Sequence, residues 1–265
     1  MNKKEKLEYF KKQYEGKIFK TNSFGDVVVL EYVNTHEVRI KFLESGGINT
    51  VCAGNLRKGL VNDFYAKTVC GVGYLGEGKY KCRVRGRTAK ADGYRAGCMT
   101  KEYSVWDGMI RRVYGDLSEQ TRRNYGDVIV CEEWHNFQNF AEWCQTQYGF
   151  GKDGYHIDKD ILTRGNRVYS PESCCFVPAH INAAVTGMKH TNSTGFTGVW
   201  KDKSSYVAEI TINGTGISLG SFSDPEKAYL MYKNVKQTYI RTLAEIYKED
   251  IDHRAYLALK EWEVM

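Results

Sequence analysis

Residues 1–66 alternate between apolar and polar positions in a pattern that predicts one helix followed by short strands. Residues 1–14 are charged and amphipathic, and we expect them to be helical. Alternating runs follow at residues 27–32, 38–42 and 48–51, and turn-forming residues separate them. This arrangement predicts a β-meander, and we expect its strands to close into a small β-barrel.

The next part of the chain predicts one hairpin and two helices. GVGYLGEGKYKCRVRG, residues 71–86, has the pattern of two strands that turn at residues 76–78. Apolar residues at helical spacing follow at 104–115 and again at 131–148. The second of these helices carries a row of large apolar side chains, which we assign to the core rather than to a ligand site: Trp134, Phe137, Phe140, Ala141 and Cys144.

Residues 154–178 carry the outline of a ββα metal site. Two short β-runs flank the turn at residues 163–166. Ser170 and Pro171 then occupy the positions of an N-cap and of a first helical residue. A hairpin followed by a short helix is the arrangement of a metal-dependent nuclease site.

The last part of the chain predicts a three-stranded sheet followed by a helix. The strands are GVWK, YVAEITI and ISLGSF, and Asn213-Gly214 between the last two is a strong hairpin signal. Ser223 or Asp224 caps a helix that has Pro225 at its start. We expect four residues to form the face that packs on the sheet: Ala228, Met231, Tyr232 and Val235.

Together these patterns predict an α+β protein of three domains. Residues 1–66 form the N-terminal small β-barrel, and residues 67–185 form a central ββα-metal domain that includes the basic hairpin. Residues 186–265 form the three-stranded sheet with its helix and a C-terminal helix. The boundary before the last domain follows a linker that becomes rich in Gly, Ser, Thr and Asn towards its end.

Charge changes this picture because it is sorted along the chain. The protein has 265 residues and a net charge of +6. Residues 67–127 carry 13 basic and 7 acidic side chains, net +6, whereas residues 128–185 carry 4 and 7, net −3. A polyanion-binding protein with a local carboxylate site shows such sorting. The chain has no apolar run of membrane-span length and no apolar signal-peptide core, so we expect a cytoplasmic protein without a membrane partner.

One stretch, KYKCRVRGR, places a cation at every second position. In an extended strand, alternate side chains point to the same side, so all of its cations would lie in one row. The row consists of Lys79, Lys81, Arg83, Arg85 and Arg87. A phosphate backbone is the partner that favours such a row, because each neutralised phosphate releases counterions. The alternative is a solvated hairpin edge whose lysines prevent strand pairing.

The C-terminal unit resembles the ethylene-response-factor type of DNA-binding domain. The resemblance rests on Thr197-Gly198-Val199, YVAEI at 206–210, LGSF at 219–222, and Glu226, Ala228 and Tyr229 in the helix. Members of that family lay a three-stranded sheet in the major groove of duplex DNA. The DNA-facing candidates implied here are Thr197, Trp200, Lys201, Lys203, Tyr206, Glu209, Thr211 and Ser218. That family uses several arginines on these strands, where this chain has Trp, Lys and Thr, so we do not expect base readout by bidentate arginine. The alternative is a small module that binds another protein.

With the preceding ββα outline, the chain resembles bacteriophage HNH-type homing endonucleases that carry such a domain. WDGMIRRVYG, VIVCEEWHNFQNFAEW and IDKDILTRGNRVYSPESCCFVP are similar to segments common in that group. The resemblance implies that His156 activates water and that Asp158 is the principal ligand of one Mg²⁺ or Mn²⁺. Asp160 and Asn166 would be supporting ligands. Where the family places Asn or His on the helix, this chain has Tyr169, Ser170 and Glu172.

Two functions therefore remain open at the level of sequence. The first is a phage-type HNH-like endonuclease that nicks or cleaves duplex DNA with a divalent metal. The second is a catalytically degenerate, nuclease-derived protein of the bacterial cytoplasm that binds phage or host DNA or a host protein. A separate metal site at Cys131, His135 and Cys144 is a third possibility, but we assign these side chains to an ordinary amphipathic segment with buried thiols.

Overall fold

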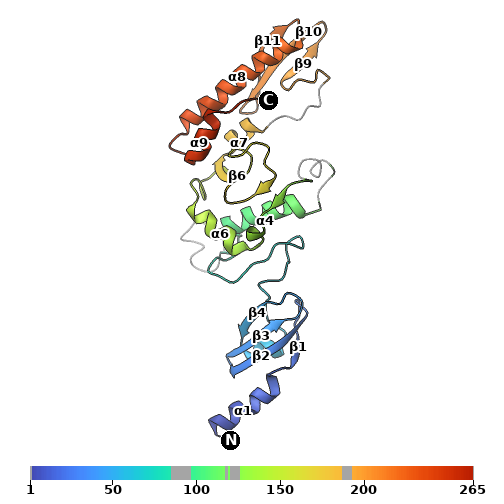
Figure 1. Ribbon diagram of the computed structural model, residues 1–265, viewed down its shortest axis with the longest axis vertical. Coiled ribbons are helices and arrows are strands. Elements are labelled where there is room, and N and C mark those ends of the chain that lie inside the picture. The colour runs from blue at the N-terminus through green and yellow to red at the C-terminus, as the bar shows by residue number, and fades with distance from the viewer. Residues whose placement is uncertain (1, 85–96, 117–118, 120–125, 187–192, 265) are drawn as a thin grey trace. The chain divides into compact units, whose positions relative to one another are not determined.

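The computed structural model describes residues 2–84, 97–116, 119, 126–186 and 193–264 (Figure 1). It is an α+β protein, as the pattern of elements predicts. Its residues divide into two compact units, one made of residues 1–126 and 130–142, the other of residues 127–129 and 143–265. Among the described residues, no helix has both the length and the apolar character needed to cross a membrane.

The N-terminal strands form an open sheet, so the predicted barrel is wrong. The four antiparallel strands have the order β1-β2-β3-β4 and are Ile18–Lys20, Asp26–Asn34, Glu37–Phe42 and Ile48–Val51. The edge strands have only three and four residues. Two helices cover the apolar face of the sheet: α1 (Lys3–Tyr14) and α2 (Ala53–Arg57) both contribute to its core. The strands therefore do not need to close into a barrel to bury that face.

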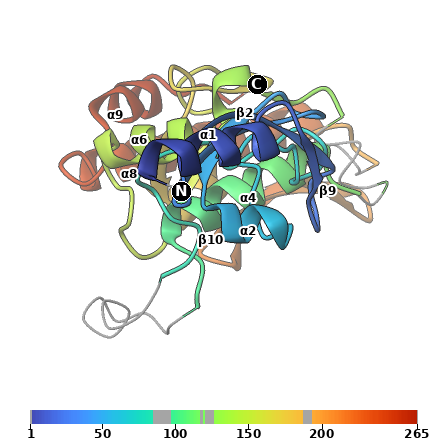
Figure 2. The same cartoon turned by 90° about the horizontal axis from the view of Figure 1, so that it is seen from below.

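Helix α1 lies against strand β2 (Figure 2), and aromatic side chains make the contact with the sheet. The ring of Phe10 stacks on that of Tyr32 with centroids 5.6 Å apart, and the ring of Tyr14 stacks on that of Phe19 at the same separation. Alternation along β3 is complete, since every second residue is buried. The predicted helix and the three predicted strands are therefore confirmed, although the way they bury their apolar face differs from the prediction.

The hairpin predicted at residues 71–86 is wrong. Gly73 pairs with Val69, and Tyr74 forms a parallel bridge with Asn136, so the first predicted strand has other partners. Val84 instead exchanges hydrogen bonds with the chain at residues 97–98. The glycines at residues 76–78 favour a turn, but the partners of the flanking segments are distant in sequence, as Tyr74 with Asn136 and Arg83 with Met99 show.

Two predicted helices pack together in the rest of the first unit. Helix α4 spans Lys101–Tyr114, and the predicted helix at 131–148 divides into a 3₁₀ turn, η1 (Glu132–His135), and α6 (Phe137–Thr146). The Trp106 indole of α4 donates to the carbonyl of Trp134 over 2.7 Å, and its ring lies 5.6 Å from that of Phe137. The five apolar residues assigned to the core at Trp134–Cys144 are all completely buried.

The second unit contains a ββα element, but its strands and helix are not those predicted. Strand β6 (Tyr155–Asp158) pairs antiparallel with β8 (Cys175–Pro178), whereas β7 (Val168–Tyr169) pairs with β5 (Ile129–Val130). The helix is α7 (Ala179–Val185), not a helix beginning at Pro171. Residues 171–173 form a single turn, because the apolar residues that follow extend into the fully buried strand β8.

The C-terminal sheet has the predicted strands in the order β11-β10-β9, namely Thr215–Phe222, Ser205–Ile212 and Val199–Asp202. Asn213 and Gly214 both have positive φ, at 49° and 80°, as the predicted hairpin turn requires. Asp224 caps helix α8 (Pro225–Ile246), which packs on all three strands. Ala228 and Tyr232 are buried on the predicted face, but Met231 is exposed, because it lies beyond the edge of that face.

The two halves of α8 belong to different cores. Its N-terminal half buries Ala228 and Tyr232 against the sheet. Its C-terminal half places Ile240, Leu243 and Ala244 in a second core, which includes β8, α7 and helix α9 (His253–Lys260). Packing thus crosses residue 185, where the sequence places a domain boundary.

We expect Ile40→Ala to lower the stability of the N-terminal sheet by about 2–5 kcal/mol, because Ile40 is completely buried there. Hydrogen exchange of the β2 and β3 amides measures this loss. Ile48→Ala is the matched control, since Ile48 is 39% exposed in the same sheet. Equal losses in the two variants would contradict the described core.

Candidate nucleic-acid interface and nuclease-like hairpin

The described part of the cationic row has the alternation expected of an extended segment. Lys79, Lys81 and Arg83 are exposed, while the residues between and after them, Tyr80, Cys82 and Val84, are partly buried. Arg85 and Arg87 lie outside the described residues. The structure therefore places three of the five candidate cations on the solvent side of one segment.

Hydrogen bonds hold this segment in its extended form. The Gln138 side chain of α6 accepts from the backbone N–H of Tyr80 and donates to its carbonyl, each over 3.0 Å, as a neighbouring strand would. Val84 donates to the carbonyl of Cys98, and Thr100 donates to that of Cys82. Arg83 also makes an isolated antiparallel bridge with Met99. Its backbone partners therefore hold residues 79–84 in place and leave Lys79, Lys81 and Arg83 on the surface.

Two of these cations have partners on the protein surface. The Lys79 ammonium lies 3.0 Å from the Glu142 carboxylate, and this hydrogen-bonded pairing raises the pKa of Lys79. The Tyr80 hydroxyl donates to the same carboxylate over 2.8 Å. Arg83 donates to the carbonyl of Gly97. Exposed pairs of this kind contribute little to stability, so a phosphate can replace Glu142 as the partner of Lys79 at small cost.

The eight candidate residues of the C-terminal sheet do not share one face. The face opposite α8 presents Trp200, which is 43% exposed, together with Glu209 and Thr211. Ser218 is paired with Glu209 on that face. Tyr206 lies on the other face, where it packs against the core under α8.

The remaining candidates lie at the margins of the sheet. Lys201 is exposed and pairs with Tyr206 across the strands, and Lys203 lies in the β9–β10 turn with a φ of 51°. Thr197 lines a cavity on the helix side, which it shares with Tyr232 and Lys236. Of the eight candidates, the outer face thus carries Trp200, Glu209, Thr211 and Ser218, while Lys201 lies on the side of Tyr206 and Lys203 lies in the turn.

The hairpin does not bring His156 and the predicted metal ligands into one site. His156 is exposed on β6 opposite Val177, and Asp158 is buried opposite Cys175. Asp158 Oδ1 accepts from the backbone N–H groups of Asp160 and Ile161, over 2.8 and 2.7 Å. Burial raises the pKa of Asp158, although these two hydrogen bonds act in the opposite direction. Asp158 therefore closes a turn with the carboxylate that the nuclease reading requires as a ligand.

The other two predicted ligands are also engaged within this loop. Lys159 is buried, and its ammonium donates to the Asp160 carboxylate over 2.7 Å and to the carbonyl of Asn166 over 2.9 Å. The Asn166 amide donates to the carbonyls of Lys159 and Val168. The Lys159 ammonium is thus bound to the carboxylate oxygen of Asp160 that a divalent cation could otherwise use.

These contacts do not fit a Mg²⁺ or Mn²⁺ site. Such a cation needs several free oxygen ligands at short distance. Across the described residues, no group of three or more His, Cys, Asp or Glu side chains lies close enough to hold a metal ion. Cys131, His135 and Cys144 therefore do not form the alternative metal site either.

Sequence reasoning missed the buried Lys159 and the residues of α7. Lys159 stands between two aspartates, a pattern that suggests a surface charge until the pairing with Asp160 is seen. Helix α7 carries His180 and Asn182, the residue types that the family resemblance requires on this helix. The His180 ring lies 4.8 Å from that of Tyr247, so it packs against α8 and its C-terminal cap.

Comparisons of the chain with known protein families, with curated proteins and with solved structures find no match.

We expect Asp158→Asn to raise the melting temperature at pH 7, because an amide oxygen still accepts both N–H groups without burying a charge. A carboxyl group whose pKa is raised by folding destabilises the folded state above that pKa. The gain should therefore fade as the pH falls through the raised pKa towards the ordinary value of 3.8.

Asp158→Ala is the matched variant. It leaves two backbone N–H groups without their acceptor, and we expect it to be less stable than Asp158→Asn by about 1–3 kcal/mol. Equal melting temperatures for the two variants would show that the turn does not depend on this acceptor.

Proposed function

We propose that this protein binds duplex DNA through the cationic row at residues 79–87 and does not cleave it. The observation that supports this most directly is the exposure of Lys79, Lys81 and Arg83 on one side of a segment whose intervening side chains are partly buried. These three cations therefore cannot turn away from a ligand without exposing Tyr80, Cys82 and Val84.

A polyanion is the ligand that this arrangement suits. Cations on a fixed extended segment contact successive phosphates and release their counterions. Arginine adds paired N–H donors that match a phosphate. The net charge of +6 on residues 67–127 adds a long-range attraction that speeds the encounter with DNA.

The C-terminal sheet supplies a second candidate contact. Trp200 offers an exposed ring on the outer face, and Lys201 and Lys203 offer cations near the β9–β10 turn. These groups suit contacts to sugars and phosphates, which position a protein on DNA without reading its sequence. A host protein in place of DNA is the competing partner for this face. Either partner would be met in the bacterial cytoplasm.

Endonuclease activity is the second candidate function, and the β6–β8 hairpin with α7 packed on it favours that reading. It would need His156 as general base and Asp158, Asp160 and Asn166 as ligands of Mg²⁺ or Mn²⁺. Since the last three are engaged in closing the loop, we favour binding without cleavage.

Replacing Arg83, Arg85 and Arg87 with Gln tests the row. Each phosphate contact contributes roughly 0.9 to the slope of log affinity against log salt, so the slope should become shallower by about 2–3. Fluorescence anisotropy with a random-sequence duplex over a range of salt concentrations measures it.

The matched control replaces Lys3, Lys4 and Lys6 with Gln, which removes the same charge from the exposed surface of α1. We expect its slope to match that of the wild type. Equal slopes for all three proteins would assign the row to solubility instead of DNA binding.

Supercoiled plasmid incubated with Mg²⁺ or Mn²⁺ tests cleavage. We expect the plasmid to stay supercoiled, because the predicted metal ligands already hold other groups. Open-circle or linear DNA that requires the metal and disappears in the His156→Ala variant would establish the endonuclease instead.

A further inference from the structure

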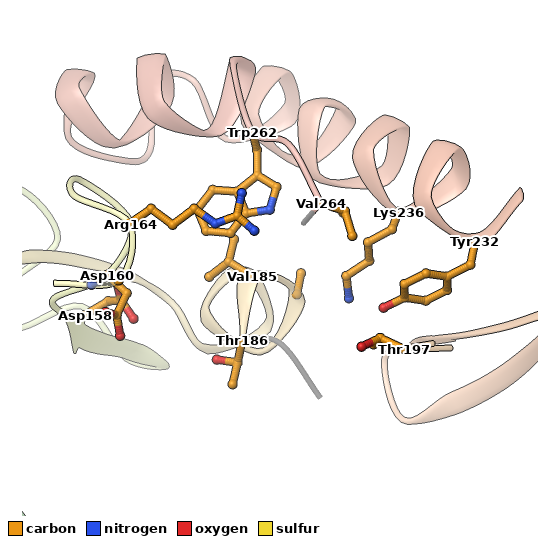
Figure 3. A pocket seen from close by; sticks show the side chains of 12 residues that line it. Asp158, Asp160, Arg164, Val185, Thr186, Thr197, Tyr232, Lys236, Trp262 and Val264 are labelled. Atoms are coloured by element: carbon orange, nitrogen blue, oxygen red, sulfur yellow. Dashed lines mark hydrogen bonds between the residues drawn. The ribbon is translucent and has the colours of Figure 1, made fainter. Parts of the chain in front are cut away.

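The second unit contains a cavity of about 310 Å³ between the loop after β6, helix α7 and helix α8 (Figure 3). Its volume is at the lower end of the range for small-molecule sites, roughly 300–1,000 Å³. Figure 3 shows two polar ends with the side chain of Val185 between them, and Val264 beside Lys236. None of the three described cations of the row, Lys79, Lys81 and Arg83, lines the cavity.

One end of the cavity combines a cation with two hydroxyl groups. The Lys236 ammonium and the hydroxyls of Tyr232 and Thr197 point into the same space in Figure 3. Lys236 is partly buried, and desolvation lowers its pKa. None of the salt bridges formed by the described residues includes Lys236. A cation in this environment gains most from an anion that comes from outside the protein.

The fold holds these groups in place. Tyr232 and Lys236 are four residues apart on α8 and so lie on the same side of the helix. The backbone at Gly198 lies directly against the Tyr232 ring, since a Cβ there would come within 2.2 Å of its Cδ2 atom. Gly198 has a φ of 71°, and this close approach brings the neighbouring Thr197 to the cavity.

The other end of the cavity offers a flat cation and acceptors. The Arg164 guanidinium makes a cation–π contact with the Trp262 ring, 5.0 Å from its centre, and donates to the carbonyl of Glu263. Bases stack on guanidinium planes, so an exposed arginine at this end can support one. Asp158 and Asp160 line the same end, and the Asp160 carboxylate, which holds Lys159 through one oxygen and stays 45% exposed, can also accept from a hydroxyl or amino donor.

We propose that this cavity binds a nucleoside monophosphate unit, with its phosphate at Lys236, Tyr232 and Thr197. Its base lies on Arg164, and its sugar or amino donors face Asp160. The same unit occurs as a free nucleotide and within a single-stranded nucleic acid. The proposal does not rest on the cationic row, so duplex binding can fail while this site remains.

Isothermal titration calorimetry on the full chain tests the proposal with nucleoside 5′-monophosphates as the probes. Inorganic phosphate and an unphosphorylated nucleoside test the two ends separately, and both should bind more weakly than the monophosphate. Lys236→Met keeps the side-chain stem and removes the charge, and we expect it to weaken monophosphate binding by about tenfold or more. Competition by a single-stranded oligonucleotide would identify the source as a nucleic acid, and its absence would identify a free nucleotide.

Lys227→Met is the control, because Lys227 is exposed on the same helix and outside the cavity. It should bind the monophosphate as the wild type does. Tyr232→Phe removes only the hydroxyl, keeps the ring on Gly198, and should weaken binding at an unchanged melting temperature. The proposal is overturned if no probe binds saturably at millimolar concentration, or if Lys236→Met binds the monophosphate as tightly as the wild type.

Discussion

The second unit depends on helix α8, whose two halves are buried in two different cores. Ala228 and Tyr232 pack into the C-terminal sheet, whereas Ile240, Leu243 and Ala244 pack against β8, α7 and α9. A helix is rigid over this length, so the sheet and the ββα element are held on one support. The cavity lined by Tyr232 and Lys236 exists because that support joins two cores instead of filling one.

The loop after β6 shows how residue types suited to a metal site can be engaged by the protein itself. A ligand carboxylate must be free to approach a metal, but Asp158 accepts two backbone N–H groups and Asp160 neutralises the buried ammonium of Lys159. Only the lysine of this pair is buried, and removing Asp160 would leave a buried ammonium with the Asn166 carbonyl as its remaining hydrogen-bond acceptor among the described residues. The same contacts that hold the loop engage these carboxylates within the protein, and for this reason we expect no divalent cation to bind there. Residues of β8 and α7 lie in the core shared with α8 and α9, so packing accounts for this arrangement of strand and helix.

Local features of the sequence predicted much of the fold. The alternation along residues 27–51, the Asn213-Gly214 turn and the Asp224 cap each depend on neighbours in sequence, and the structure confirms all three. The errors concern distant partners. Whether helices or strand closure would cover the N-terminal sheet, and which segment would pair with Val84, depend on residues far along the chain. The same limit applied to the candidate site. The resemblance gave the residue types at Asp158, Asp160 and Asn166, but it did not predict which groups these side chains contact.

The lysines of this chain differ in their surroundings, and these surroundings decide what each charge can do. Lys79 and Lys81 are exposed on an ordered segment, where a charge stays solvated and costs the fold little stability. An incoming phosphate adds a favourable contact there. Lys159 is buried with Asp160, and its charge is satisfied within the protein. Lys236 is partly buried without a carboxylate among its described partners, so its charge opposes folding. A fold does not gain stability from such a residue. A cation that costs stability at the edge of a cavity is best explained by a ligand that compensates it, which connects the packing of α8 to the chemistry of the cavity.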